Sequence, residues 1–212
     1  MSLFRLDASI RAEGSSSRGL GDIVEQTWRE SAPNETVVRR EIGLDPLPST
    51  AWALAVFAGY TPEEERTPEQ RSAVALAATV VDELLNADAL LFTVPLYNFG
   101  VSQHLKTWVD LAMTDPRLGA QGGQPLKEKR AVLVLVRGGA YGPGTPRDGW
   151  DHSSSWIQRI LRDVWGLDLV VVEREFTLVG VNPALDEFKN LAADMRRDAE
   201  HLATVHAKHL LD

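Results

Sequence analysis

Apolar residues follow two different periods along the chain, and the two periods alternate. Residues 89–94 and 131–136 are short, almost continuous apolar runs, which are typical of strands buried on both faces of a parallel sheet. Elsewhere apolar positions recur three or four residues apart, as on the buried face of a helix. The expected strands comprise residues 3–6, 36–42, 89–94, 131–136 and 169–173. The expected helices comprise residues 20–28, 51–60, 67–86, 102–113, 156–165 and 183–209.

Local chemistry marks several of these boundaries. Thr67 can cap a helix, Pro68 suits the first helical position, and Gln70 completes a capping box. Ser102 can cap the helix at 102–113 in the same way. Pro95 has no backbone N–H to donate, so we expect the strand before it to end there.

The connection between the first strand and the first helix is rich in hydroxyl groups. It spans residues 7–18 and contains Ser9, Ser15, Ser16 and Ser17. Hydroxyls and free amides at the positive end of a helix dipole suit a phosphate group. The same serines can also act only as helix caps, and the sequence leaves both interpretations open.

Two nearby glycines suggest a dinucleotide-binding motif but do not complete one. Gly19 and Gly21 match the start of G-x-G-x-x-G, yet Val24 occupies the position of the third glycine. The pair also lies well beyond the end of the strand, whereas the motif needs a tight turn directly after it. We therefore reject this motif.

Two other loops follow the buried strands and have unusual compositions. Residues 96–100, with the sequence Leu-Tyr-Asn-Phe-Gly, are too few for an element and too aromatic for a simple connection. After the strand at 131–136 come Arg137, Gly138 and Gly139. Adjacent glycines let a backbone approach a flat ligand closely.

Strands and helices alternate from end to end, without a repeat or an internal linker. This predicts an α/β fold with one domain over residues 1–212: a doubly wound, five-stranded parallel sheet with helices on both faces. In the flavodoxin-like strand order 2-1-3-4-5, the three unusual loops meet at one edge of the sheet. Planar cofactors bind at that edge in open α/β sheets.

Composition narrows the class of protein. The 212 residues have a formal net charge of −8, which argues against nucleic-acid binding because phosphates need a basic surface. No apolar run approaches the roughly 20 residues of a membrane-spanning helix, and the first residues lack the profile of a signal peptide. Cysteine is absent, which excludes disulfides and thiolate chemistry. We therefore expect a cytoplasmic protein.

A segment with large aromatic residues follows the second strand. It contains Trp52, Phe57 and Tyr60 and ends in three consecutive glutamates at 63–65. Apolar side chains on a surface segment need something to cover them. The segment either folds back on its own domain or forms a subunit contact. Both remain open, and we predict a homodimer with these three residues near the interface.

These motifs resemble those of the FMN-dependent NAD(P)H azoreductases and quinone reductases of the flavodoxin-like superfamily. The resemblance covers roughly residues 3–206, and its most specific part is the Tyr-Asn-Phe sequence at 97–99. The matching pieces are Ser9 with Ser15–Ser17, residues 95–99 with Gln103-His104-Leu105-Lys106 and Asp110, and Arg137-Gly138-Gly139.

The resemblance implies that one FMN binds non-covalently and that hydride passes from NADH or NADPH to a quinone or an aromatic azo compound in a two-electron, ping-pong reaction. The serines would hold the FMN phosphate with Arg18 as a charge partner, and Tyr141 would contact the substrate. No side chain is assigned as a general base, because the flavin supplies the chemistry. The implied FMN-binding residues are Ser9, Ser15, Ser16, Ser17, Pro95, Leu96, Tyr97, Asn98, Phe99, Val136, Arg137, Gly138 and Gly139.

Other classes of function compete with this interpretation. An FMN-binding electron carrier, or a flavin-binding regulatory protein without its own NAD(P)H turnover, would share the fold. A serine hydrolase is a poor match because no G-x-S-x-G sequence occurs. His104 and His152 are isolated in the sequence, so we expect no metal site. The loop at 114–129 lacks the aromatic residues of relatives, which leaves the choice of acceptor open.

Overall fold

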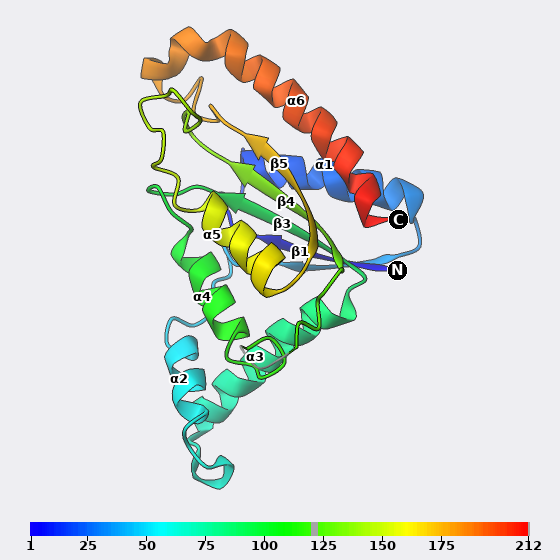
Figure 1. Cartoon of the computed structure of the whole chain (residues 1–212), viewed down its shortest axis with the longest axis vertical. Coiled ribbons are helices and arrows are strands. Elements are labelled where there is room, and N and C mark those ends of the chain that lie inside the picture. Colours follow the sequence, from blue (N-terminus) through cyan, green and yellow to red (C-terminus); the bar gives the residue numbers. More distant parts are fainter. Residues whose placement is uncertain (120–122, 212) are drawn as a thin grey trace.

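The computed structural model describes residues 1–119 and 123–211, so residues 120–122 of the loop at 114–129 lie outside the described part. Parallel strands form a five-stranded sheet in the order β2-β1-β3-β4-β5 (Figure 1). The predicted flavodoxin-like order is therefore confirmed. The strands are β1 (Ser2–Asp7), β2 (Thr36–Arg40), β3 (Ala89–Pro95), β4 (Arg130–Val136) and β5 (Asp168–Arg174).

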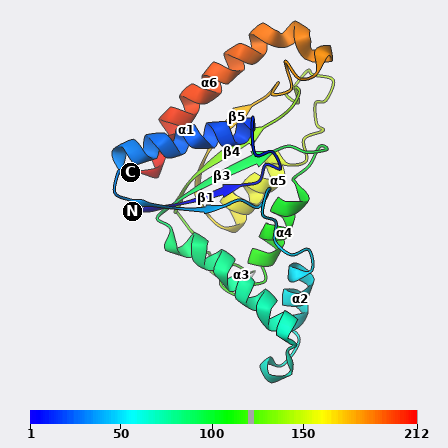
Figure 2. The ribbon, with the colours of Figure 1, turned by 180° about the vertical axis from the view of Figure 1, so that it is seen from behind.

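Helices cover both faces of the sheet, as predicted. Figure 2 shows α1 (Ser16–Ser31) and α6 (Lys189–Ala207) side by side on one face. The other face is covered by α3 (Pro68–Asn86), α4 (Gln103–Ala112) and α5 (Ser154–Gln158). In the described part of the chain, none of the helices is both long enough and apolar enough to span a membrane.

Alternate residues of the central strands enter two separate cores, because neighbouring side chains of a strand point to opposite faces. Leu91 of β3 packs on the side of α1 and α6, whereas Phe92 packs on the side of α3 and α4. Trp108 of α4 stacks on Phe4 with ring centroids 6.4 Å apart and meets Phe92 edge-on at 6.1 Å. This packing positions α4 and hence the loop that precedes it.

Helix starts follow the predicted capping, whereas two helical segments differ in type. The Thr67 hydroxyl accepts from the Gln70 amide at 3.2 Å, and the Ser102 hydroxyl accepts from Leu105 at 3.1 Å. The expected helix at 156–165 is α5 followed by a π-helix at Arg159–Val164. The expected helix at 183–209 has 3₁₀ turns at Pro183–Phe188 and Lys208–Leu210 on either side of α6.

A buried arginine explains why β1 tolerates a charge in its centre. Arg5 is 2 % exposed, and its guanidinium donates to Asp7 at 2.9 and 3.1 Å. It also donates to Asp22 at 2.7 Å and Glu25 at 3.1 Å, both on α1. Burial lowers the pKa of Arg5, but the carboxylates of Asp7 and Asp22 outweigh it and raise the pKa overall. The charge therefore holds α1 on the sheet.

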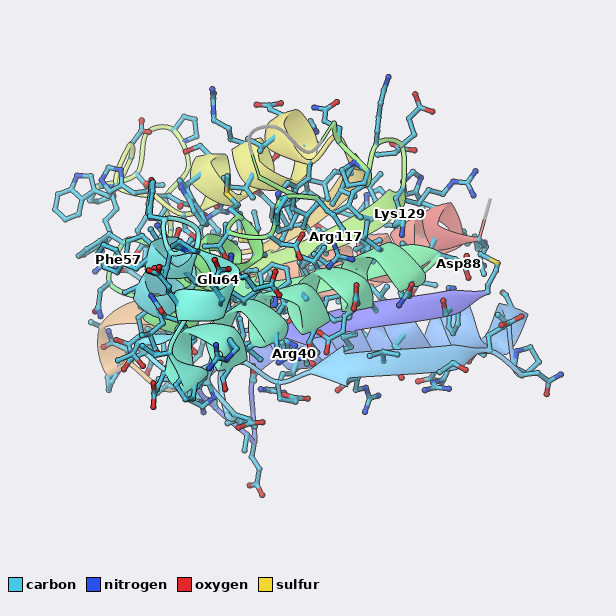
Figure 3. All side chains as sticks on the ribbon, turned by 90° about the horizontal axis from the view of Figure 1, so that it is seen from below. Arg40, Phe57, Glu64, Asp88, Arg117 and Lys129 are labelled. Carbon is cyan, nitrogen blue, oxygen red and sulfur yellow. The ribbon has the colours of Figure 1, made fainter. Side chains whose placement is uncertain are left out.

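The aromatic segment forms α2 (Ala51–Ala58). This helix packs against α3 and also contacts α4 (Figure 1). Its alanines pack on alanines of α3, so that face folds back on its own chain. Trp52 is 47 %, Phe57 63 % and Tyr60 85 % exposed. Figure 3 shows Phe57 and Glu64 near one end of α3 and Asp88 near the other. The described residues thus leave these three aromatic side chains exposed, two on α2 and one just after it.

Two glycines of α1 have different packing, which gives a matched test of the helix–sheet contact. A Cβ at Gly21 would lie 2.6 Å from Thr93 Cγ2, whereas a Cβ at Gly19 would meet nothing within 4 Å. We expect Gly21→Ala to lower the free energy of unfolding by about 1–3 kcal/mol through overpacking. Gly19→Ala should raise it by roughly 0.5–1 kcal/mol because alanine favours the helix. Urea denaturation measures both, and equal effects would contradict this packing.

Candidate functional site

The three unusual loops line one cavity of about 350 Å³ at the carboxyl edge of the sheet. Apart from Arg137, every residue predicted for the site lines this cavity, and so does Tyr141. The predicted residues that line it are Ser9, Ser15, Ser16, Ser17, Pro95, Leu96, Tyr97, Asn98, Phe99, Val136, Gly138 and Gly139. Convergence follows from topology, since β1, β3 and β4 are neighbours in the sheet and parallel. Ligand binding by these residues remains a prediction.

The serine loop combines a helix cap with available donors. The Ser15 hydroxyl accepts from the Arg18 amide at 3.4 Å and so caps α1. Ser16 and Ser17 are the first two residues of α1, where amides have no acceptor within the helix. These amides and hydroxyls lie at the positive end of the helix dipole. Capping and anion binding are therefore compatible at this loop.

Arg18 braces this loop and does not line the cavity. Its guanidinium donates to the carbonyls of Ser9 and Arg11, both at 3.0 Å, and binds the Glu41 carboxylate. The nearest Asp7 carboxylate oxygen is 3.8 Å away. The sequence predicted Arg18 as a charge partner for a phosphate, but Arg11 is the arginine from this loop that lines the cavity. The difference arises because the Arg18 side chain is already engaged with these partners.

Gly43 packs directly against the backbone of the serine loop, and the sequence analysis did not identify it. A Cβ at this position would lie 2.0 Å from the carbonyl oxygen of Ser9, a contact that backbone atoms cannot relieve by rotation. The Gly43 amide also donates to the Asp7 carbonyl at 3.2 Å. Gly43 therefore allows the chain after β2 to pass directly beneath Ser9. The sequence gives no signal for this role, because Ser9, the residue that the Gly43 backbone packs against, is distant along the chain.

The loop after β3 folds into a tight turn with a strained conformation. Tyr97 and Gly100 exchange backbone hydrogen bonds of 3.1 and 3.0 Å around Asn98 and Phe99. Asn98 has φ of 48° and Phe99 has φ of 68°, values that suit asparagine but disfavour phenylalanine. The His152 amide holds the turn by donating to the Phe99 carbonyl at 2.9 Å. Such strain is typical of functional sites.

Tyr97 connects two of the loops. Its hydroxyl accepts from the Ile10 amide at 3.2 Å and lies 3.3 Å from the Ser9 hydroxyl. Ser9 is 1 % exposed, and its hydroxyl also accepts from the Arg11 amide at 3.2 Å. The loops after β1 and β3 are therefore held together at the floor of the cavity before any ligand enters.

The loop after β5 forms part of the cavity wall, which the sequence analysis did not predict. Thr177 and Leu178 line the cavity. The Leu178 amide donates to the Gly138 carbonyl at 3.0 Å, and the Thr177 amide donates to the Arg137 carbonyl at 3.1 Å. A Cβ at Gly138 would lie 2.6 Å from Leu178 Cδ1. Gly138 therefore provides room for this wall.

Arg137 faces a neighbouring cavity of about 610 Å³ instead. Its guanidinium donates to Asp151 at 2.5 Å, Ser154 at 2.9 Å and Glu173 at 3.1 Å. Burial lowers the pKa of Arg137, but Glu173 and Asp151 outweigh it and raise the pKa. Burial likewise opposes ionisation of Asp151, yet hydrogen bonds from Ser154 and Arg137 lower its pKa. Both groups are therefore charged and satisfied near neutral pH.

Phe99, Tyr141 and Arg147 line the first cavity, and Trp150 lies next to Phe99 without lining it. The Phe99 ring lies 6.4 Å from the Tyr141 ring and 5.4 Å from the Trp150 ring, edge-on in both cases. The Arg147 guanidinium carbon lies 5.6 Å from the Tyr141 ring centroid. Sequence reasoning did not identify Arg147 or Trp150, because the residues between Gly139 and α5 follow no period. His104 does not line this cavity.

Comparison with known proteins places the fold and the family. A family model described as "Flavodoxin-like fold" matches residues 1–201. The chain is also similar to solved structures. An azoreductase from Bacillus anthracis has a TM-score of 0.79 at 22 % identity, covering 98 % of both chains. An FMN-dependent NADH-azoreductase from the same species, solved in complex with FMN, has a TM-score of 0.75 at 17 % identity, covering 98 % of this chain and all of the other. At these identities the likeness supports the fold.

Sequence relatives extend over nearly the whole chain. An FMN-dependent NADH:quinone oxidoreductase from Frankia alni is 37 % identical over 203 residues, covering 93 % of this chain and 94 % of the relative. One from Streptomyces coelicolor is 34 % identical over 216 residues, covering 99 % and 95 %. The chain therefore belongs, as its motifs predicted, to the FMN-dependent NADH:quinone oxidoreductase family of flavodoxin-like fold.

Proposed function

We propose that this chain is an FMN-dependent NAD(P)H oxidoreductase that reduces quinones and aromatic azo compounds by two electrons. The observation that supports it most is the convergence of the loops after β1, β3 and β4 on one cavity. The names of relatives that align over nearly the full chain agree with this activity. We place the enzyme in the cytoplasm, where reduced nicotinamide nucleotides are available.

The lining of the cavity fits FMN at both ends. The amides and hydroxyls of Ser15–Ser17 and the Ser9 hydroxyl suit the phosphate, and Arg11 supplies a positive charge beside them. Residues 96–99, which include the strained turn, and the glycine pair at 138–139 line the same cavity, and aromatic side chains beside an uncovered backbone suit a flat ring. Arg137 contributes by holding the loops after β4 and β5 together through its backbone and side chain.

Bound FMN would supply the hydride chemistry, and the protein binds, orients and partly shields it. Phe99 is 39 % exposed beside Tyr141, so the mouth of the cavity remains open to a second flat molecule. We propose that nicotinamide and acceptor occupy this mouth in turn. An electron carrier or a regulatory flavoprotein would share the cavity but would not need an exchange of two substrates there.

Reconstitution with FMN tests the function. The protein should bind one FMN per chain and release unmodified FMN on denaturation, and NADH or NADPH should bleach its visible absorbance rapidly. Initial rates over several concentrations of a quinone should give parallel double-reciprocal lines, as in a ping-pong scheme. Negligible reduction by both nucleotides would favour the carrier or regulatory alternative. Selectivity for FAD would contradict the cofactor assignment.

A substitution at Gly139 tests the position of the ring. A Cβ at Gly139 meets only the flexible end of Arg147, at 3.1 Å, so Gly139→Val should fold but place a branched side chain in the cavity. We expect FMN affinity to fall at least about tenfold, a loss of roughly 1.4 kcal/mol. Gly142→Val is the matched control, because Gly142 lies in the same loop, lines the other cavity and has open space. Flavin titration and thermal melts separate binding from stability, and unchanged affinity in Gly139→Val would remove this loop from the ring site.

The exposed aromatic side chains on and just after α2 support a homodimer. Its alanines already pack on α3, yet Trp52, Phe57 and Tyr60 remain exposed, which is a costly arrangement for three large aromatic side chains of one segment. A second copy of the chain would cover them in a two-fold contact. We propose that this contact lies near the acceptor site.

Oligomeric state after substitution tests this interface. Light scattering should give the mass of a dimer for the native chain, and Phe57→Glu should shift it toward the monomer because a charge would be buried. Val181→Glu is the control, since Val181 is similarly exposed at 65 % but follows β5 and lies outside residues 51–60. A native monomer at micromolar concentration would contradict the dimer, and the acceptor site would then come from one chain.

A further inference from the structure

The cavity proposed for FMN has charge of one sign. Among the described residues that line it, the charged ones are Arg11 and Arg147, with no aspartate or glutamate beside them. In a chain with a formal charge of −8, this is a local reversal of sign that favours anionic ligands. The neighbouring cavity is acidic. Its charged lining residues are Arg137, Asp151, Glu173, Glu175 and Asp198.

The two arginines serve different parts of the cavity. Arg11 belongs to the loop after β1, and its guanidinium lies 3.4 Å from the position of a Cβ on Gly14. Arg147 follows β4, and its Nη1 lies 3.1 Å from the position of a Cβ on Gly139. In the sheet, β3 lies between β1, which precedes Arg11, and β4, which precedes Arg147. The proposed FMN phosphate at the serine loop therefore accounts for Arg11 and leaves Arg147 without a role.

Arg147 is oriented but not neutralised. Its Nη1 donates a long hydrogen bond of 3.4 Å to the Tyr141 hydroxyl, and its guanidinium carbon lies 5.6 Å from the Tyr141 ring centroid. Within residues 1–119 and 123–211, no carboxylate oxygen lies within 4 Å of this guanidinium. By contrast, the Arg137 guanidinium is surrounded by carboxylates. The Arg147 charge is thus available to a ligand.

Flat aromatic surfaces lie beside this charge. Phe99 is 39 % and Trp150 51 % exposed, and their rings are 5.4 Å apart. Phe99 also meets Tyr141, the residue that orients Arg147. Stacking faces and a planar guanidinium side by side recognise a flat aromatic molecule that carries a negative group.

We propose that Arg147 determines acceptor specificity by binding a sulfonate or carboxylate on the aromatic acceptor. The proposal rests on the proposed quinone reductase function and adds the class of acceptor that the site prefers. The ring of the acceptor lies against Phe99, and its anionic substituent reaches the Arg147 guanidinium at the rim. Neutral quinones lack this second contact and bind less well.

The ratio of kcat/KM for 1,4-naphthoquinone-2-sulfonate to that for 1,4-naphthoquinone, measured on the FMN-loaded enzyme, tests the proposal. Comparing this ratio between variants cancels the intrinsic difference in reactivity of the two quinones. Arg147→Ala should lower it about fivefold, and Arg147→Lys should retain most of it, as expected for a partly exposed ionic contact. Arg159→Ala removes the same charge from an exposed position outside the cavity and should leave the ratio unchanged.

A binding measurement decides the proposal without any electron transfer. Naphthalene-2-sulfonate should perturb the flavin absorbance with a lower Kd than neutral 2-naphthol, and Arg147→Ala should remove that preference. Equal ratios and equal Kd preferences in Arg147→Ala and the native enzyme would overturn the proposal. So would a rise in KM for NADH with the neutral quinone while the acceptor ratio stays constant, because Arg147 would then bind the nucleotide. Failure of the proposed function would instead abolish turnover of both quinones.

Discussion

One buried carboxylate at the end of β1 joins β1 to β3, two of the strands whose loops line the cavity. Asp7 is 1 % exposed and accepts from the Arg5 guanidinium at 2.9 and 3.1 Å and from the Thr93 hydroxyl of β3 at 2.6 Å. Its backbone carbonyl accepts from Gly43, after β2. Breaking one partner of a buried ion pair leaves an uncompensated charge. The point at which the serine loop leaves the sheet is therefore firmly positioned.

Whether an arginine near the cavity can bind a ligand depends on the groups that its guanidinium already contacts. Arg18 and Arg137 lie beside the cavity, but their guanidinium groups are engaged by carboxylates and backbone carbonyls. Arg11 and Arg147 have no such carboxylate partner among the described residues. The two cavities share Tyr141 yet differ in charge. A short distance along the sheet edge thus separates a cationic environment from an acidic one.

Local sequence patterns determined the elements, the fold class and most of the cavity lining. The apolar runs at 89–94 and 131–136 predicted buried strands, and hydroxyl caps at Thr67 and Ser102 marked helix starts, because periodicity and capping depend on neighbours along the chain. Alternation of strands and helices then predicted a parallel sheet, and in the flavodoxin-like strand order the unusual loops meet. The Tyr-Asn-Phe sequence at 97–99 identified the family.

Tertiary structure alone decided which side chains reach the cavity. Sequence could not distinguish Arg18 from Arg11, because the direction of each guanidinium depends on Glu41 and on carbonyls of a folded loop. It could not reveal that Gly43 lies beneath Ser9, or that the loop after β5 forms a wall against Gly138. These contacts join segments that are distant in sequence. Periodicity and motif spacing describe a chain locally, whereas the charge and shape of a cavity depend on non-local packing.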